Sequence, residues 1–187
     1  MIDRVGGGSA ARRRCAMMWP MRKSAAATVS SLFFVAAPGF AAALVPWLLT
    51  GWRMRDDLPP LLLWPARVVG VVLIAAGVPV LVHAFVRFVK EGLGTPLPAA
   101  PTEHLVVGGL YRYVRNPMYV AVTATVLGQA LLLDQPVLLL YAAVLWIAFA
   151  LFVRAYEEPT LRRRYGESYD EYRRTVPAWI PRPARSR

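Results

Sequence analysis

The sequence predicts an all-α polytopic membrane protein with about four transmembrane helices. Of its 187 residues, 57% are hydrophobic and only 18% are charged, and the charged residues are clustered. Long uncharged runs of this kind are typical of membrane-spanning helices. The single cysteine, Cys15, excludes an internal disulfide and any zinc or iron–sulfur site held by several cysteines of this chain. We expect no metal site.

Four apolar stretches define the expected spans, at residues 24–50, 61–89, 118–133 and 136–153. The first two are long enough to cross a bilayer, which takes about 20 residues. The last two are short, and only Asp134 and Gln135 separate them. We therefore expect a helical hairpin with a tight polar turn near the far interface.

The start of the chain is strongly basic, with six Lys and Arg residues before Ser24, and its composition is typical of a disordered tail. A basic start followed by an apolar run and the sequence GFAAA also fits a cleaved secretory signal. However, the apolar run continues through Leu49 and is too long for a signal. This length favours a first transmembrane helix.

Basic residues are distributed unequally about the spans. Besides the six in the tail, four lie from Arg87 to Arg115, around the end of the second span and in the loop after it, and nine lie from Arg154 onward. The opposite side has Arg53 and Arg55, which acidic residues accompany. Because basic loops stay in the cytoplasm, we expect both termini to be cytoplasmic, in a bacterial inner (plasma) membrane. The same asymmetry accounts for the net charge of +11 without nucleic acid as a partner.

Most of the unusual polar residues lie in two segments that flank the hairpin, at residues 91–120 and 153–181. The hairpin returns the chain to the same face, so the end of the first segment and the start of the second should be neighbours. We expect a pocket between them, half in the membrane and half in the cytosol.

An acidic pair follows the last apolar stretch directly. Arg154 lies three and four residues before Glu157 and Glu158, so a regular helix places all three on one face. Adjacent carboxylates repel each other near a low-dielectric region, and we expect them to face Arg154, other basic side chains or a ligand. Simple interfacial anchoring is the alternative.

Three further patterns surround these residues. An amphipathic stripe, interrupted at Gly166 by an expected turn, is predicted to pack on the membrane surface or on helix ends rather than to bind a ligand. Its members are Leu161, Tyr165, Tyr169, Tyr172 and Val176. Asn116 and Pro117 are expected to cap and begin the third span. Tyr111, Tyr113 and Tyr119 fit an interfacial aromatic belt.

The sequence LVVGGLYRYVRNPMY at residues 105–119, the hairpin, and then RAYEEPTLRRRYGESYDEYRRTVPAWIP together carry a family pattern. It resembles the integral-membrane methyltransferases that include isoprenylcysteine carboxyl methyltransferase and the phospholipid N-methyltransferases. The resemblance covers about residues 91–181. It implies methyl transfer from S-adenosylmethionine, bound at the cytoplasmic face in a pocket that the C-terminal segment closes.

The resemblance also assigns residues to the cofactor. These are His104, Leu105, Val106, Val107, Tyr111, Asn116, Pro117, Met118, Tyr119 and Glu158. Glu158 is the candidate for the ammonium group, and Arg154 corresponds to an arginine on the substrate side. Asn116 stands where the family has histidine, and Glu103 rather than His104 occupies the aligned histidine position.

The residue types suit this chemistry. Aromatic faces and carboxylates favour a sulfonium cation, and each cation–π contact is worth about 0.5–2 kcal/mol. Arg154 and Glu157 are the expected catalytic residues, with Glu157 and Glu103 as candidate general bases. His83 would line the lipid-side entrance, although a lone interfacial histidine is more often a packed structural residue.

The expected acceptor is a lipid or lipid-like molecule whose carboxylate, amine or thiol takes the methyl group. We therefore divide the chain into a basic tail at 1–23, two transmembrane helices at 24–90 and a methyltransferase core at 91–187. The alternative is a non-enzymatic membrane scaffold or transporter subunit whose basic tails bind anionic lipid. The oligomeric state stays open.

Overall fold

The computed structural model describes residues 37–92, 105 and 107–181, and every regular element in these ranges is a helix or helical turn. In chain order the elements are the π-helical turn η1 (Phe40–Leu44), α3 (Val45–Thr50), α4 (Pro60–Gly92), the 3-10 turn η2 (Gly109–Arg112), α5 (Pro117–Leu133), α6 (Pro136–Phe152), the π-helical turn η3 (Val153–Glu157), α7 (Glu158–Tyr165) and α8 (Glu167–Thr175). The all-α class is confirmed for these residues. The predicted disordered tail lies outside them.

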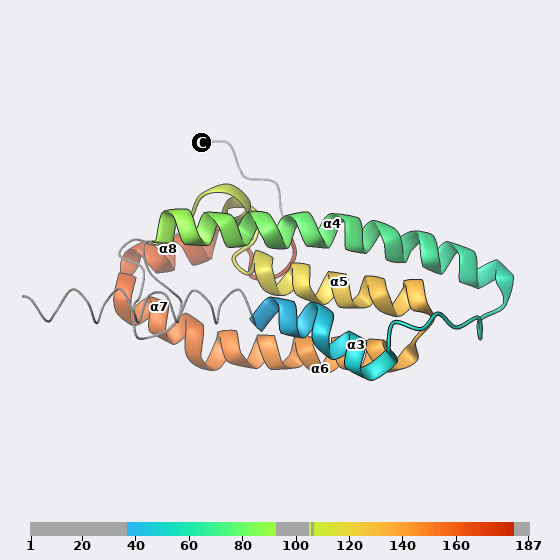
Figure 1. Ribbon diagram of the computed structural model, residues 1–187. Coiled ribbons are helices and arrows are strands. Elements are labelled where there is room, and N and C mark those ends of the chain that lie inside the picture. Colours follow the sequence, from blue (N-terminus) through green and yellow to red (C-terminus); the bar gives the residue numbers. More distant parts are fainter. Residues whose placement is uncertain (1–36, 93–104, 106, 182–187) are drawn as a thin grey trace, which may run out of the picture.

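Helices α4, α5 and α6 run side by side, and α3 lies against α6 (Figure 1). By length and composition, the helices Pro60–Ala84 and Pro136–Tyr165 are able to cross a membrane, whereas Ala37–Thr50 and Pro117–Leu133 are apolar but shorter. Large apolar side chains of α4 and α6 are exposed, such as Leu140 at 67%, as expected of helices solvated by lipid. These features support a membrane protein, and the count of four spans stays a prediction.

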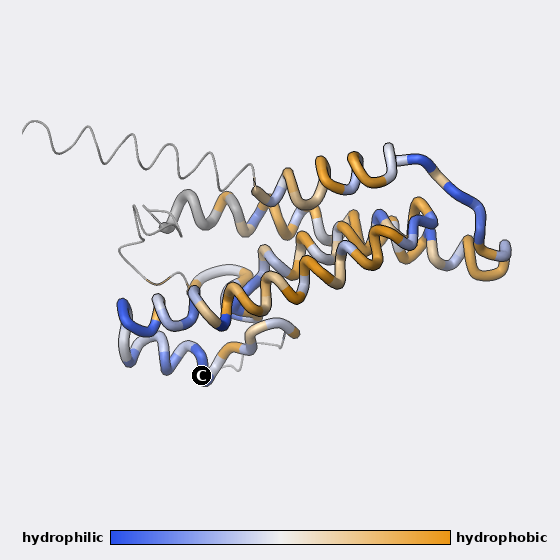
Figure 2. The backbone as a smooth tube through the Cα atoms, turned by 90° about the horizontal axis from the view of Figure 1, so that it is seen from below, coloured by the Kyte–Doolittle hydropathy of each residue, from blue (hydrophilic) through white to orange (hydrophobic). Residues whose placement is uncertain are grey.

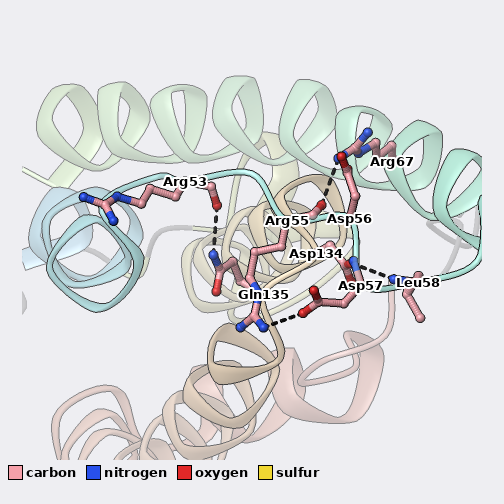
Figure 3. Close-up of polar contacts among 8 residues, drawn as sticks. All are labelled: Arg53, Arg55, Asp56, Asp57, Leu58, Arg67, Asp134 and Gln135. Atoms are coloured by element: carbon pink, nitrogen blue, oxygen red, sulfur yellow. Dashed lines mark hydrogen bonds and ion pairs between the residues drawn. The ribbon is translucent and has the colours of Figure 1, made fainter.

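The predicted hairpin is formed by α5 and α6, which Asp134 and Gln135 connect. Asp134 ends α5 in the left-handed conformation at φ 53° and is only 7% exposed. Its Oδ2 accepts hydrogen bonds from the main-chain N–H groups of Asp57 (2.8 Å) and Leu58 (3.0 Å). The Gln135 side chain donates to the carbonyl of Arg53 at 2.8 Å (Figure 3). The polar turn therefore fastens the connection between α3 and α4 to the hairpin.

The substitution Asp134→Ala is expected to lower the melting temperature of the detergent-solubilised protein by several degrees. It removes the charged acceptor of two partly buried main-chain N–H groups, and a hydrogen bond to a charged group contributes about 1.5–3 kcal/mol. The matched control is Asp57→Ala, which removes a carboxylate whose ion pair with Arg55 is half exposed. Melting curves of the two variants that coincide would contradict this role of Asp134.

The helical turn η1, directly before α3, is held to the hairpin through two of its carbonyl groups. Pro46 lacks the N–H that would bond to Ala42 in a regular helix, and the Gln129 side chain donates to the Ala42 carbonyl instead, at 2.6 Å. The Tyr141 hydroxyl donates to the neighbouring carbonyl of Ala41 at 3.0 Å. Side chains of α5 and α6 thus donate hydrogen bonds to two carbonyl groups at the point where Pro46 has no N–H to donate.

Helices α4 and α5 approach each other closely at glycines. A Cβ atom added at Gly70 would lie 2.7 Å from the Gly128 oxygen and 2.7 Å from the Leu132 nitrogen, both in the α5 backbone. A Cβ at Gly128 would lie 2.7 Å from the Gly70 oxygen in return. The two backbones can approach this closely because glycine has no side chain, as in close helix packing within membranes.

Hydrophilic residues gather at the two ends of the bundle (Figure 2). One end holds the connection between α3 and α4 together with the hairpin turn. The other holds α7 and α8, which extend from the end of α6 (Figure 1). The hairpin thus returns the chain to the end at which α5 begins.

Candidate functional site

The candidate site lies at the end of the bundle where α5 begins and α6 ends (Figure 1). The helix of α6 continues through η3 into α7 and stops at Tyr165. Gly166, with φ 54° and ψ −127°, then turns the chain into α8. That conformation lies in a region that suits glycine, so the turn predicted there is confirmed.

Hydrogen bonds join the two polar segments that flank the hairpin. The main-chain N–H of Arg115 donates to the Pro177 carbonyl at 2.9 Å, the Asn116 side-chain amide to the Ala178 carbonyl at 3.1 Å, and the Tyr172 hydroxyl to the Tyr111 carbonyl at 2.7 Å. The end of the first segment also bonds to the start of the second, through Tyr119 to Glu157 and Arg115 to Glu158, which confirms their predicted proximity.

Asn116 and Pro117 begin α5 as predicted, with Asn116 at the cap position. The side chain of Asn116 makes no capping hydrogen bond, however, so that part of the prediction is wrong. The residue is 7% exposed, and its amide binds Ala178. Asn116 therefore fastens the C-terminal segment to the start of α5.

A cavity of about 80 Å³ lies between the joined segments. Its walls are formed by Leu105, Tyr111, Arg115, Asn116, Val153, Glu157, Glu158, Leu161, Tyr169 and Tyr172. Four of the predicted cofactor residues, and the predicted catalytic Glu157, are among them. Ligand pockets usually measure about 300–1,000 Å³. A ligand of cofactor size therefore requires the two segments to separate.

The acidic pair lies where a π-helical turn interrupts the long helix. The N–H of Glu158 bonds to the Val153 carbonyl, five residues back, and Pro159 follows without an N–H of its own. Such turns are frequent at functional sites. The Glu157 carboxylate accepts a hydrogen bond from the Tyr119 hydroxyl at 3.0 Å. Tyr119 therefore orients Glu157 from α5.

Glu158 is held by two cations from other parts of the chain. Its Oε1 lies 2.8 Å from Arg115 Nη1, and its Oε2 lies 3.6 Å from Arg173 Nη2. The Arg115 and Glu158 side chains are only 11% and 17% exposed. The sequence left open whether the acidic pair faces Arg154, other basic side chains or a ligand. Within the described residues, Arg115 and Arg173 rather than Arg154 make the ion pairs with Glu158.

The aromatic stripe of the C-terminal segment packs on the helix ends, one of its two predicted positions. Leu161, Tyr169 and Tyr172 of the stripe also line the cavity, and the expectation that the stripe binds no ligand stays a prediction. Tyr169 is 2% exposed and accepts a hydrogen bond from Arg115 at 3.3 Å. Burial raises the pKa of Tyr172 and, with the nearby Glu158 carboxylate, that of Tyr169. Both phenols therefore stay protonated at neutral pH.

Arg154 lies exposed in the wall of a second cavity, of about 590 Å³. The lining is Ala150, Val153, Arg154, Glu158, Pro159, Arg162, Arg173 and Trp179. Val153 and Glu158 line both cavities, so the two are adjacent. The second cavity combines three arginines with an apolar side.

An apolar groove of about 460 Å³ lies among α4, α5 and α6. Trp146 is one of its lining residues, and the Trp146 ring contacts the ring of Trp179, with 4.7 Å between centroids. Trp179 belongs to the second cavity. The tryptophan pair therefore stands between an apolar groove and an arginine-rich cavity.

The other predicted residues lie apart from the first cavity or beyond the described ranges. His104, Val106 and Glu103 are outside those ranges, and Val107 is exposed. Pro117 and Met118 are buried in the first turn of α5, and His83 is exposed on α4. Within the described ranges, no group of three or more His, Cys, Asp or Glu residues is placed to hold a metal ion.

Sequence reasoning missed Arg115, Arg173, Tyr169 and Tyr172 as parts of the site. The one available signal was the position of Arg115 directly before Asn116, within the first segment. Arg115 was instead counted only among the basic residues that predicted the orientation of the protein in the membrane. The tyrosines were assigned to a surface stripe because their spacing alone does not say what the stripe packs against.

Comparison with known proteins places the chain in a family. The model of the phospholipid methyltransferase family matches residues 65–168, more than half of the chain, and the chain belongs to this family. It is 42% identical over 78 residues to protein-S-isoprenylcysteine O-methyltransferase of Schizosaccharomyces pombe, which is 41% of this chain and 33% of that protein. It is 33% identical over 78 residues to protein-S-isoprenylcysteine O-methyltransferase B of Arabidopsis thaliana, which is 41% of this chain and 39% of that protein. The matches therefore span only 33% and 39% of the length of these relatives. The family predicted from the sequence is confirmed.

Proposed function

We propose that the protein is an S-adenosylmethionine-dependent membrane methyltransferase that methylates a lipid-like acceptor. The observation that carries this proposal is the ion-paired Glu158 beside Glu157 in a tyrosine-lined cavity, formed by segments that lie mostly within the family match. The names of the two relatives, both O-methyltransferases, support the reaction class.

The residues of the first cavity fit the chemistry of this cofactor. Glu157 and Glu158 supply negative charge for a cationic ligand, and the rings of Tyr111, Tyr169 and Tyr172 favour a sulfonium and an adenine. When bound, S-adenosylmethionine supplies an electrophilic methyl group on a sulfonium cation. Val153 and Leu161 give the cavity apolar walls, which exclude water from the reacting groups.

We place the acceptor in the second cavity and in the adjoining apolar groove. Arg154 and Arg162 would attract an anionic group, and the Trp146–Trp179 pair stands at the point where an apolar chain would continue into the groove. This arrangement favours a carboxylate on an amphiphilic molecule over an amine, because three arginines repel a cation. His83 is exposed on α4 and is not part of these walls.

A carboxylate acceptor would also need no general base at the site. A carboxylate oxygen carries no proton at neutral pH, so none would have to be removed before it accepts a methyl group. Arg154 would hold the carboxylate beside the wall of Val153 and Glu158 that both cavities share. Most of the acceleration then comes from alignment of the reacting atoms. Glu157, bound to Tyr119, is the candidate base if the acceptor is an amine or a thiol.

We further propose that the end with α7 and α8 faces the cytoplasm in a plasma membrane, with both termini on that side. The hydrophilic end of the bundle with α7 and α8 carries the arginines of these helices, whereas at the other end Arg55 and Arg67 pair with Asp57 and Asp56 (Figures 2 and 3). This charge distribution supports the orientation.

The test is methyl transfer from methyl-labelled S-adenosylmethionine in nanodiscs. The probes are an S-isoprenylated N-acetylcysteine, its carboxamide and phosphatidylethanolamine. We expect label on the carboxylate probe alone, as a methyl ester that releases labelled methanol in base, and at least about a tenfold loss in Arg154→Met from the missing charge-assisted hydrogen bond. Label on phosphatidylethanolamine in a base-stable form would overturn the acceptor, and no labelled product with any membrane lipid would favour the scaffold alternative.

A further inference from the structure

The second cavity receives two arginines from one continuous helix, which α6, η3 and α7 form. Arg154 belongs to η3 and Arg162 to α7. Residues eight positions apart lie about 80° apart around a regular α-helix. The π-helical turn winds the chain less tightly, which reduces this angle. Both side chains therefore line the same cavity.

Asp170 holds Arg162 from outside this cavity. Arg162 Nε lies 3.2 Å from each carboxylate oxygen of Asp170, and Asp170 is not among the residues that line the cavity. The bend at Gly166 between α7 and α8 brings the two side chains together. Asp170 is itself fixed in the first turn of α8, where its N–H donates to the Gly166 carbonyl at 3.2 Å. The carboxylate therefore supports Arg162 from behind.

The contact with Asp170 occupies one edge of the guanidinium group. Within the described residues, the ion pair and the hydrogen bond of Arg162 to Asp170 both use Nε. The two terminal nitrogens carry four further N–H donors, and a parallel pair of them matches the two oxygens of a carboxylate. Arg162 can therefore keep Asp170 at Nε and bind a second carboxylate through its terminal nitrogens.

Confinement of Arg162 matters because water reaches both side chains. The Arg162 side chain is 61% exposed and that of Asp170 is 26% exposed. A free arginine side chain at such a position samples many rotamers, and a ligand that binds it has to fix them at a cost in entropy. The bond from Asp170 restricts these rotamers before the ligand arrives, which lowers that cost.

The negative charge of Asp170 would by itself have the opposite effect. A negative group near the cavity repels an anionic ligand, so its removal should strengthen the binding of a carboxylate. If Asp170 instead positions Arg162, its removal should weaken that binding. The direction of the change therefore distinguishes positioning from simple repulsion.

We propose that Asp170 is a positioning residue, which aims Arg162 so that Arg162 and Arg154 together bind the carboxylate of the acceptor. The inference rests on the proposed function and names the residue that supports Arg162 in the second cavity. The ligand class is an amphiphilic carboxylate.

The experiment measures methyl transfer to S-isoprenylated N-acetylcysteine, and its inhibition by the carboxamide, with the full chain in phosphatidylcholine nanodiscs. Asp170→Asn should raise the KM for the acid by about two- to fivefold, the range of an exposed ion pair. The kcat, the inhibition constant of the uncharged carboxamide and the affinity for S-adenosylmethionine should stay unchanged. Arg162→Met should raise the same KM by about fivefold, and Asp170→Asn added to it should have no further effect.

The control is Glu167→Gln, which removes the same charge from an exposed position of α8 and should not raise the KM. Asp170→Glu keeps the carboxylate and should raise the KM less than Asp170→Asn does. An unchanged or lower KM in folded Asp170→Asn, or losses that add up in the double variant, would overturn the positioning role. An unchanged KM in Arg162→Met would overturn it as well, even where Asp170→Asn fails to fold. A wild type that methylates no carboxylate would instead overturn the proposed acceptor, and the inference with it.

Discussion

The substitution Glu158→Gln is expected to weaken the binding of S-adenosylmethionine by about 10- to 100-fold, which corresponds to one charge-assisted hydrogen bond of about 1.5–3 kcal/mol. Glu158 is 17% exposed on its side chain and faces the first cavity, so its charge is only partly screened by water. Glutamine keeps the size of the side chain and an acceptor oxygen for Arg115. Calorimetric titration of the purified variant measures the effect.

Glu167→Gln is the matched control, because it removes the same charge from an exposed position at the start of α8. That variant should bind as the wild type does. Melting curves must show that both variants are folded. If Glu158→Gln and Glu167→Gln lost the same affinity, the total negative charge of the protein would explain the effect. That result would contradict the role assigned to Glu158.

The substitution Gly70→Ala is expected to lower the stability of the bundle by about 1–3 kcal/mol, the usual effect of overpacking. The added Cβ would lie 2.7 Å from two backbone atoms of α5, which cannot move as a flexible side chain would. Helices α4 and α5 must therefore separate. For a chain of this size the melting temperature should fall by at least about 2–4 °C.

Gly39→Ala provides the comparison for this prediction. A Cβ at Gly39 meets no heavy atom within 4 Å, and its φ of −64° suits any residue. This variant should melt as the wild type does. Unchanged melting of Gly70→Ala in the same detergent would contradict the close contact between α4 and α5.

The features of the fold that local sequence determines were predictable. The apolar stretches predicted α4, α5 and α6, and the polar Asp134–Gln135 pair predicted the hairpin turn. Gly166 predicted the break between α7 and α8. Each depends on residues within a few positions of one another. Proximity of the two polar segments followed from the hairpin by connectivity alone.

Partners across the fold were not predictable in the same way. Arg115 reaches Glu158 from 43 positions away, and Asn116 reaches Ala178 from 62 positions away. A regular helix would also have set Arg154 and Glu158 on one face, but the π-helical turn η3 adds a residue to that turn. Only the three-dimensional arrangement decides which of several arginines meets the acidic pair.

Photo-crosslinking tests most directly whether the first cavity holds S-adenosylmethionine. Full-length protein in nanodiscs would be irradiated with methyl-labelled S-adenosylmethionine, with and without excess unlabelled ligand, and the labelled peptides identified by mass spectrometry. We expect saturable label in peptides that contain Tyr111, or Tyr169 and Tyr172, because these rings line the cavity. Saturable label only at the opposite end of the bundle, around Trp52, or no saturable label in folded protein, would contradict the account.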